Sequence, residues 1–390
     1  MMNERENLIE KVKVGYKKNF AGEPLLVRAP GRINLIGEHT DYNNGFVLPA
    51  AVSHAIYFAI GLSEDSDQCS LISLDFDNRY DFKLSEMKPL EADSWQNYIM
   101  GVIAEIEKSG RKTAGFNMVF SGDVPRGSGM SSSAALECGT CFGLNELFHL
   151  NIPKVEMVKM SQMAEHNYAG VKCGIMDQFA SMMGHQDQAL LLDCRSLEYS
   201  HFPIVLNDYS LLLCNSNVTH SLASSQYNVR RQQCEEGVTI LQKQFPDIES
   251  LRDADGMQLS EVKDKMSESV YLRCKYVIEE NERVNTFTKV LTENDLVKAG
   301  SLLKKAQFAM RYEYEVTCPE IDFMADFANN HKDVLGARMM GGGFGGCTLN
   351  LIKKGSEPLF IDELNERYQA EFNKSITPIE VKISDGVSLI

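Results

Sequence analysis

The sequence is short of positive charge. It carries 39 Lys and Arg against 54 Asp and Glu, a formal net charge of -15 at pH 7. This balance argues against a general nucleic-acid binder, which needs a basic face to neutralise phosphates. A nucleotide ligand stays compatible, because one phosphate tail needs only a few local amides and a cation. Hydrophobic content of 44% and charged content of 24% are ordinary for a soluble globular protein.

Long apolar runs and a cysteine framework are also missing. The longest apolar stretch, Phe46–Leu62, is broken by polar residues and a proline, which favours strands over a membrane span. Residues 1–6 are charged and lack the apolar core of a signal peptide. The ten cysteines have no framework spacing, and Cys138 and Cys141 match C-x-x-C without the second pair that zinc needs. We therefore expect two small buried thiols there and a cytoplasmic protein without membrane contact.

A chain of 390 residues is too long for one core, so we expect two domains, residues 1–205 and 206–390. Hydrophobic periodicity predicts helices at Asn7–Asn19, Trp95–Glu107, Ser131–Phe148, Val155–Tyr168, Gln226–Phe245, Val270–Leu291 and Asp295–Tyr312. It predicts strands at Leu25–Arg28, Gly45–Ala50, Ala55–Leu62, Ser70–Leu74, Gly115–Ser121, Leu190–Asp193, Tyr209–Cys214, around Ala337 and at Cys347–Ile352. Clustered strands followed by long helices indicate an α+β protein in two parts.

Polar groups crowd the segment from Glu38 to Tyr42. An apolar run, Ile33–Ile36, ends at Gly37, and two carboxylates, an imidazole and a phenol follow before the turn signal Asn43–Gly45. Carboxylates accept pairs of hydroxyl protons, so this segment is typical of a pocket for a polyhydroxylated molecule. A charged surface hairpin is the alternative interpretation.

A Gly/Ser loop forms a second candidate site at Gly122–Ala135. A proline and two glycines make a tight loop, and three serines then open a helix whose free amides and dipole favour an anion. The loop is not a Walker A motif, because the Gly-Lys-Ser/Thr ending is missing. An ordinary N-capped helix after a flexible loop is the structural alternative.

Two weaker signals follow. Gly341–Gly346 formally contains G-x-G-x-x-G, but an alternating strand pattern follows where a dinucleotide fold needs a helix, so a Rossmann interpretation fails. Asp177 is a lone carboxylate in an apolar stretch, and Glu165 lies on the preceding predicted helix. Lone acids of this kind are commonly helix caps or salt-bridge partners. One carboxylate and a loop serine would also form half a shell for Mg²⁺, which takes few protein ligands.

In this order, the blocks resemble the GHMP small-molecule kinases and, within them, the galactokinase family. Residues 31–42 are similar to the galactokinase signature, with Ile33 where Val is commoner, and residues 124–137 to the superfamily's phosphate loop, with Met130 replacing Leu. Residues 337–347 resemble the third glycine-rich motif, and 173–178, 225–235 and 314–322 also fit. The resemblance implies a two-domain GHMP-kinase-like fold with the active site in the cleft between domains.

The resemblance also implies transfer of the ATP γ-phosphoryl group to the C1 hydroxyl of α-D-galactose. Asp177 would take or orient the hydroxyl proton, while Arg32 keeps that carboxylate charged and steadies the phosphoryl group. Sugar contacts would be Glu38, His39, Thr40, Asp41, Gly174 and Tyr227. ATP contacts would be Gly127, Ser128, Gly129, Met130, Ser131, Ser132 and Ser133, with Trp95 a candidate for the adenine pocket or else a core tryptophan. Mg²⁺ would be held by Ser133 and Glu165.

This chain departs from the galactokinase pattern before the 314–322 region. It has Ala306-Gln307 and Tyr312-Glu313 where the family usually carries Ser-His and Asp-Asp, which leaves secondary contacts open. Two alternatives also stay open. One is a kinase of a related sugar such as N-acetylgalactosamine, galacturonate or arabinose, and the other is a non-catalytic galactose sensor. Complete Ser131–Ala135, Arg32 and Asp177 favour the enzyme, and no oligomeric state is predicted.

Overall fold

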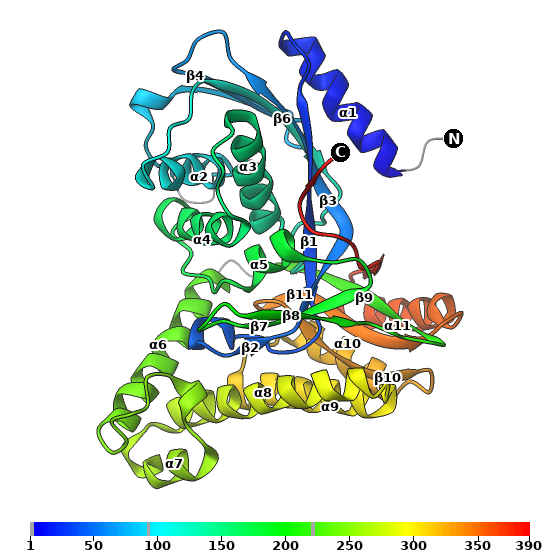
Figure 1. The fold of residues 1–390 in the computed structure, drawn as a ribbon. Helices are drawn as coiled ribbons and strands as arrows, with labels where there is room; N and C mark the ends of the chain where they lie inside the picture. The colour runs from blue at the N-terminus through cyan, green and yellow to red at the C-terminus, as the bar shows by residue number, and fades with distance from the viewer. Residues whose placement is uncertain (1–3, 92–93, 220–222) are drawn as a thin grey trace.

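Three sheets organise the computed structural model, which describes residues 4–91, 94–219 and 223–390 (Figure 1). The six-stranded sheet has the order β13-β1-β3-β6-β4-β5 and is antiparallel except where β4 lies beside β6. Its strands are β1 (Leu25–Asn34), β3 (Pro49–Leu62), β4 (Gln68–Ser73), β5 (Asn78–Lys83), β6 (Phe116–Gly122) and β13 (Ser388–Leu389). The smaller sheets, β10-β11-β9-β12 and β2-β7-β8, consist of β2 (Phe46–Val47), β7 (Gln188–Asp193), β8 (Tyr199–Pro203), β9 (Tyr209–Thr219), β10 (Val334–Met340), β11 (Gly345–Lys353) and β12 (Thr377–Glu380).

Helices cover both faces of the six-stranded sheet. α1 (Glu4–Asn19) lies on one face, and α2 (Gln96–Lys108), α3 (Ser132–Phe148) and α4 (Lys154–Ala164) lie on the other (Figure 1). Helix α2 buries Ile99, Val102, Ile103 and Ile106, which are spaced as one face of a helix. Burial of this stripe against α3 and α4 stabilises the segment as a helix, as its periodicity predicts.

The remaining helices are α5 (Met176–Met183), α6 (Ala223–Gln242), α7 (Gly256–Glu261), α8 (Glu268–Thr292), α9 (Leu296–Ala309), α10 (Pro319–Asn330) and α11 (Glu357–Phe372). Of these, α5 packs against β1 and β3 of the six-stranded sheet, and the others lie in the part of the molecule that holds the smaller sheets (Figure 1). α9 and α10 both pack against β10, the strand that leads into the glycine run. Two single π-helical turns, 165–169 after α4 and 310–314 after α9, extend those helices. Such turns often occur at functional sites.

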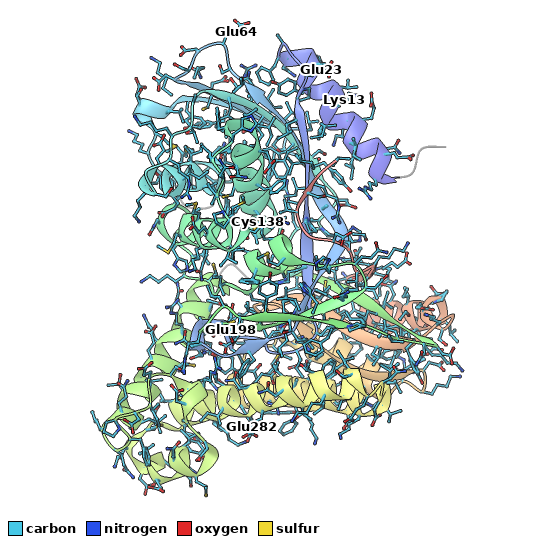
Figure 2. All side chains as sticks on the ribbon, in the orientation of Figure 1. Lys13, Glu23, Glu64, Cys138, Glu198 and Glu282 are labelled. Atoms are coloured by element: carbon cyan, nitrogen blue, oxygen red, sulfur yellow. The ribbon has the colours of Figure 1, made fainter. Side chains whose placement is uncertain are left out.

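The glutamates labelled in Figure 2 and Cys138 differ in how deeply they lie in the molecule. Glu23, Glu64 and Glu282 lie at the outer edges of the molecule, whereas Cys138 lies within it (Figure 2). Cys138 and Cys141 are both buried and free on α3, which confirms their interpretation as small core residues. Among the described residues, no helix is both long enough and apolar enough to cross a membrane.

Several predicted elements differ from the observed ones. The predicted strand at 25–28 continues through Pro30 and Gly31 to Asn34, because the pairing with β3 shifts register there and an irregular ladder tolerates both residues. The predicted strands at 45–50 and 55–62 are instead the short β2 and one long β3. Sequence patterns also missed β5, β8, β12, β13 and helices α5, α7, α10 and α11.

The predicted division at residue 205 lies in the connection between β8 and β9. The chain's last strand does not stay with the sheet of residues 209–380, since β13 pairs with β1 through Leu389 and Val27. The boundary itself stays a prediction.

Candidate functional site

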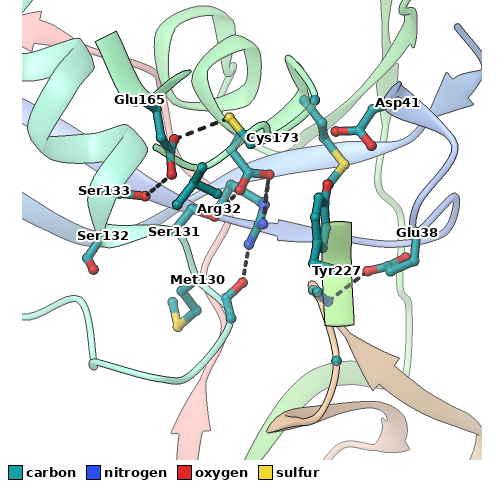
Figure 3. Close-up of a pocket in the computed structure, with 18 of the residues that line it drawn as sticks. Arg32, Glu38, Asp41, Met130, Ser131, Ser132, Ser133, Glu165, Cys173 and Tyr227 are labelled. Atoms are coloured by element: carbon teal, nitrogen blue, oxygen red, sulfur yellow. Dashed lines mark hydrogen bonds and ion pairs between the residues drawn. The ribbon is translucent and has the colours of Figure 1, made fainter. Parts of the chain in front are cut away.

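A cavity of about 360 Å³ gathers most of the predicted site residues (Figure 3). Its lining includes Arg32, Glu38, His39, Asp41, Gly127, Gly129, Met130, Ser131, Ser132, Ser133, Glu165, Gly174, Asp177 and Tyr227. Gly341, Gly342 and Gly343 also line it, so the glycine run that was a weak signal in the sequence contributes to the site. Residues from both sides of the predicted domain boundary therefore meet in one cavity.

The Glu38–Asp41 segment is buried, which rules out the surface-hairpin interpretation. Arg338, fully buried on β10, places its Nη1 2.7 Å from Oε2 of Glu38. The backbone N–H of Gly341 donates to the other oxygen of Glu38 at 3.0 Å. These contacts tie the signature segment to the glycine run, and burial raises the pKa of Glu38 despite the neighbouring Arg338.

Asp41 lies against Gly174. An added Cβ at Gly174 would approach Oδ2 of Asp41 to 1.8 Å, so only glycine permits this contact. Burial raises the pKa of Asp41 to about 7, with a further contribution from the charge of Asp177. The carboxyl group of Asp41 therefore changes its charge near neutral pH.

Asp177, in the first turn of α5, is held by two segments that are distant in sequence. Nε and Nη2 of Arg32 lie 2.8 and 2.7 Å from its Oδ1, and the Ser131 hydroxyl donates to its Oδ2. Arg32 also donates to the carbonyl oxygen of Gly129. A carboxylate fixed in this way faces the cavity in one orientation, as general-base or positioning chemistry requires.

The phosphate-type loop packs against the glycine run. Gly129 has φ of 74° and lies against the carbonyl of Met340, which an added Cβ would approach to 3.0 Å. Ser131 has φ of 56° and precedes the first residue of α3, so the helix N-terminus opens at the cavity with its amides free for an anion. A left-handed serine is a strained conformation of the kind found at functional sites.

A second carboxylate cluster lies beside Ser133. Ser133 Oγ is 3.4 Å from Oε1 of Glu165, and the Cys173 thiol is 3.4 Å from the other oxygen of Glu165. The amide of Gln178 donates to Glu165 at 2.9 Å and to Glu137 at 3.0 Å. Burial and the charge of Asp177 raise the pKa of Glu165 to about 7. Figure 3 shows Glu165 on the opposite side of Tyr227 from Glu38 and Asp41.

Trp95 lies in a separate cavity of about 260 Å³. Its ring stacks at 6.3 Å on Phe76, which Arg126 covers at 3.6 Å, and it is partly exposed rather than part of the closed core. Ser132 and Ser133 line both cavities, so the loop lies between them. A flat aromatic and apolar cavity beside an anion site is suited to a base attached to phosphates.

Two predicted contacts do not line either cavity. The Thr40 hydroxyl donates to the carbonyls of Gly37 and Phe46, at 2.9 and 2.7 Å, and shapes the turn. Ser128 is buried and donates to the carbonyl of Pro125 at 2.6 Å. Both hydroxyls support the backbone of their loops.

Sequence reasoning missed Arg338 and left the departures from the family pattern open. Arg338 is a charge in an otherwise apolar strand just before the glycine run, and that was its only signal. Gln307 accepts a hydrogen bond from the Met339 N–H at 2.7 Å and therefore supports β10. Glu313 pairs with Lys275, so both departures act on the supporting structure behind the cavity.

Comparisons with known proteins agree with this geometry. The galactokinase galactose-binding signature matches residues 15–62, the GHMP kinases N terminal domain 97–185, and the GHMP kinases C terminal domain 287–370. The chain is 42% identical over 365 residues to the galactokinase of Thermotoga petrophila, covering 93% of this chain and 99% of that protein. It is 40% identical over 387 residues to the galactokinase of Clostridium acetobutylicum, covering 98% of each.

Solved structures share the fold. The structure is similar to that of Lactococcus lactis galactokinase complexed with galactose, with a TM-score of 0.94, 33% identity and complete coverage of both chains (100%). A mevalonate kinase aligns with a TM-score of 0.64 at 16% identity, which shows the fold alone. The expected α+β GHMP-kinase fold is confirmed.

Proposed function

The chain belongs to the galactokinase family of the GHMP kinases, and on that premise we propose that it transfers the γ-phosphoryl group of ATP to the C1 hydroxyl of α-D-galactose. The products are galactose 1-phosphate and ADP. The observation that carries the proposal is a single cavity in which Asp177 lies between the Glu38–Asp41 segment and the N-terminus of α3.

Asp177 and Arg32 act on the reacting atoms. The C1 oxygen forms a bond to the γ-phosphorus, and the bond from that phosphorus to the β–γ bridging oxygen breaks as ADP leaves. The hydroxyl proton passes to Asp177, which Arg32 and Ser131 hold in place. Arg32 and the α3 amides stabilise the charge on the transferred group, and positioning supplies most of the catalysis.

The sugar lies on the side of Glu38, His39 and Asp41. Buried acceptors at fixed positions reject a sugar that lacks the matching hydroxyl, since they would be left without a partner. The contact between Asp41 and Gly174 closes one wall of this pocket and leaves no room for a side chain at position 174. Gly174 and Tyr227 complete the sugar contacts, and the galactokinase relatives support galactose over the related sugars.

ATP extends across both cavities. We place its phosphates on the Gly127–Ser133 loop and its adenine against Trp95, because Ser132 and Ser133 line the two cavities. Ser133 and Glu165 would hold Mg²⁺, and their hydroxyl and carboxylate oxygens, 3.4 Å apart, fit a hard cation. The ion would supply charge neutralisation on the phosphates. Among the described residues, no group of three or more His, Cys, Asp or Glu could hold a metal, so phosphate and water would provide its other ligands.

The proposal includes two coarser features of the protein. We retain a division into residues 1–205 and 206–390, with the site between them. We also retain a cytoplasmic location, which all ten cysteines being free supports.

The test is ADP release with a panel of sugars, namely galactose, N-acetylgalactosamine, galacturonate and arabinose. We expect the highest kcat/KM with galactose, and a loss of about 10³-fold or more in kcat for Asp177→Ala, as for a residue that acts only on the transition state. Galactose binding without turnover would favour the non-catalytic sensor. A higher kcat/KM with one of the other sugars would instead identify a kinase of that sugar. Full activity in Asp177→Ala would remove that residue from its role.

A further inference from the structure

A row of hydrogen-bonded side chains lies behind the sugar segment. Tyr42 Oη is 2.8 Å from Nδ1 of His39 and 2.7 Å from Oη of Tyr314, and Tyr314 Oη is 3.3 Å from Sγ of Cys234. The three other members of the row, Tyr42, Tyr314 and Cys234, come from the signature segment, from the π-helical turn at 310–314 and from α6. None of them is needed for phosphoryl transfer as described above.

Each member of the row is neutral at ordinary pH. Burial raises the pKa of Tyr42 and of Tyr314 well above the ordinary value, and it raises the pKa of the Cys234 thiol to about 11. Burial lowers the pKa of His39 to about 3, so its imidazole carries one proton on one of its two nitrogens. Which nitrogen holds that proton is set by the hydrogen bond at the other.

The direction of the row follows from its strongest contact. A phenol is a better donor than a neutral imidazole, and an imidazole nitrogen is a better acceptor than a phenol oxygen, so Tyr42 donates to Nδ1. Tyr314 then donates to Tyr42, and the Cys234 thiol donates to Tyr314. The reverse direction would end on sulfur, which is a weak acceptor.

The Nε2 atom of His39 is itself buried, on a residue that lines the cavity. It has no hydrogen-bond partner of regular geometry among the described residues, although the backbone of Gly342, which also lines the cavity, lies close enough to the ring to raise the pKa of His39 slightly against the effect of burial. The backbone of His39 has φ of 61°. Its ring lies against the rings of Tyr227 and Tyr314, with centroids 5.2 and 5.0 Å away. Its orientation is therefore fixed, and a buried N–H at Nε2 is costly as long as it lacks an acceptor of regular geometry.

We propose that Tyr42 and Tyr314 form a hydroxyl relay that fixes His39 as the Nε2–H tautomer, so that His39 donates a hydrogen bond to a hydroxyl oxygen of the substrate. The identity of that substrate rests on the proposed function, but the relay does not. The neighbouring carboxylates of Glu38 and Asp41 supply acceptors, and the relay supplies a neutral donor. Tyr42 and Tyr314 are thus positioning residues that set which hydroxyl orientation the pocket accepts.

The first test needs no substrate. The full chain is labelled with ¹⁵N-histidine, and the His39 signals are assigned by their loss in His39→Asn. We expect the shift of an acceptor nitrogen at Nδ1 and of an N–H at Nε2, and a mixture of tautomers in Tyr42→Phe. Tyr276→Phe is the matched control, because its buried hydroxyl donates to the Glu38 carbonyl at 3.1 Å and its ring packs on Tyr314 outside the relay. It should leave the His39 shifts unchanged.

The second test is kinetic. Tyr42→Phe and Tyr314→Phe should raise KM for galactose about tenfold, the size of one hydrogen bond, with a smaller change in kcat. A proton on Nδ1 in the unmodified protein, or an unchanged tautomer in Tyr42→Phe, would overturn the relay. Absence of galactose turnover in the unmodified protein would instead count against the proposed function, and the ¹⁵N result would stand independently.

Discussion

The fold controls the charge of Asp41 through burial. Its carboxyl group is buried beside Asp177, and its pKa rises from the ordinary value of 3.8 to about 7. An acid with a raised pKa in the folded state stabilises the fold below its unfolded pKa, and that contribution is lost as pH rises through the folded pKa. Titration of Asp41 should therefore contribute to the pH dependence of the stability of the ligand-free protein between pH 4 and pH 8, together with other buried acids such as Glu165.

Asp41→Asn isolates this effect, because the amide has the same shape and does not titrate. The unfolding free energy of the unmodified protein minus that of Asp41→Asn should fall by up to about 4 kcal/mol between pH 4 and pH 8. Urea unfolding at a series of pH values measures the difference. A constant difference across this range would show that Asp41 titrates as an exposed aspartate.

The loop and the glycine run form the element on which the phosphate site depends. Gly129 and Gly110 both have positive φ, 74° and 86°, but only at Gly129 would an added Cβ meet backbone, at 3.0 Å from the Met340 carbonyl. Gly110 has open space around it within 4 Å. The two glycines therefore separate the cost of a left-handed conformation from the cost of moving the loop.

Gly129→Ala should lower kcat/KM for ATP about tenfold or more. The loop must shift away from β10, and the Gly129 carbonyl, which accepts a hydrogen bond from Arg32, moves with it. Gly110→Ala should cost about 1 kcal/mol of stability and leave activity unchanged. ADP-release kinetics and thermal unfolding of both variants measure this. Equal kinetics in the two variants would mean that loop position does not limit phosphate binding.

Patterns of single elements were predicted where local physics decides them. The apolar stripe of α2 is predictable because the buried face of a helix has a fixed sequence period. The start of α3 is predictable because serines are common at a helix N-terminus. The long β3 was divided because residues 51–54 interrupt its apolar pattern, and those residues pair with β1 and with the 381–385 segment. The 381–385 segment, which supplies part of this pairing, is more than 300 residues away in sequence, so the local pattern does not reveal it.

At the scale of the whole molecule, one buried ion pair joins segments about 300 positions apart. Glu38 and Arg338 are 1% and 0% exposed, and Arg338 also donates to the Leu35 carbonyl at 2.9 Å. Breaking such a pair leaves a charge without its partner, which costs about 3–5 kcal/mol. Glu38 can take a proton when it loses Arg338, but the carbonyls around Arg338 then also lose their donor.

Arg338→Met should therefore cost about 3–5 kcal/mol, Glu38→Gln less, and the double variant less than the sum of the two. Urea unfolding without substrate measures all three. Glu23→Gln is the control, because its pair with Lys17 is exposed and screened by solvent, so its loss should leave stability nearly unchanged. Additive losses in the double variant would contradict coupling through this pair.

By itself, the sequence determined the family and the types of groups in the site, because Glu38–Asp41, the serine loop and Asp177 require particular chemistry at fixed local spacing. The tertiary structure alone decided which of them meet. It turned Thr40 and Ser128 toward their own backbones, and it brought Arg338 onto Glu38 and Tyr314 onto Tyr42. Contacts of this kind depend on packing between distant segments, and no local period or composition encodes them.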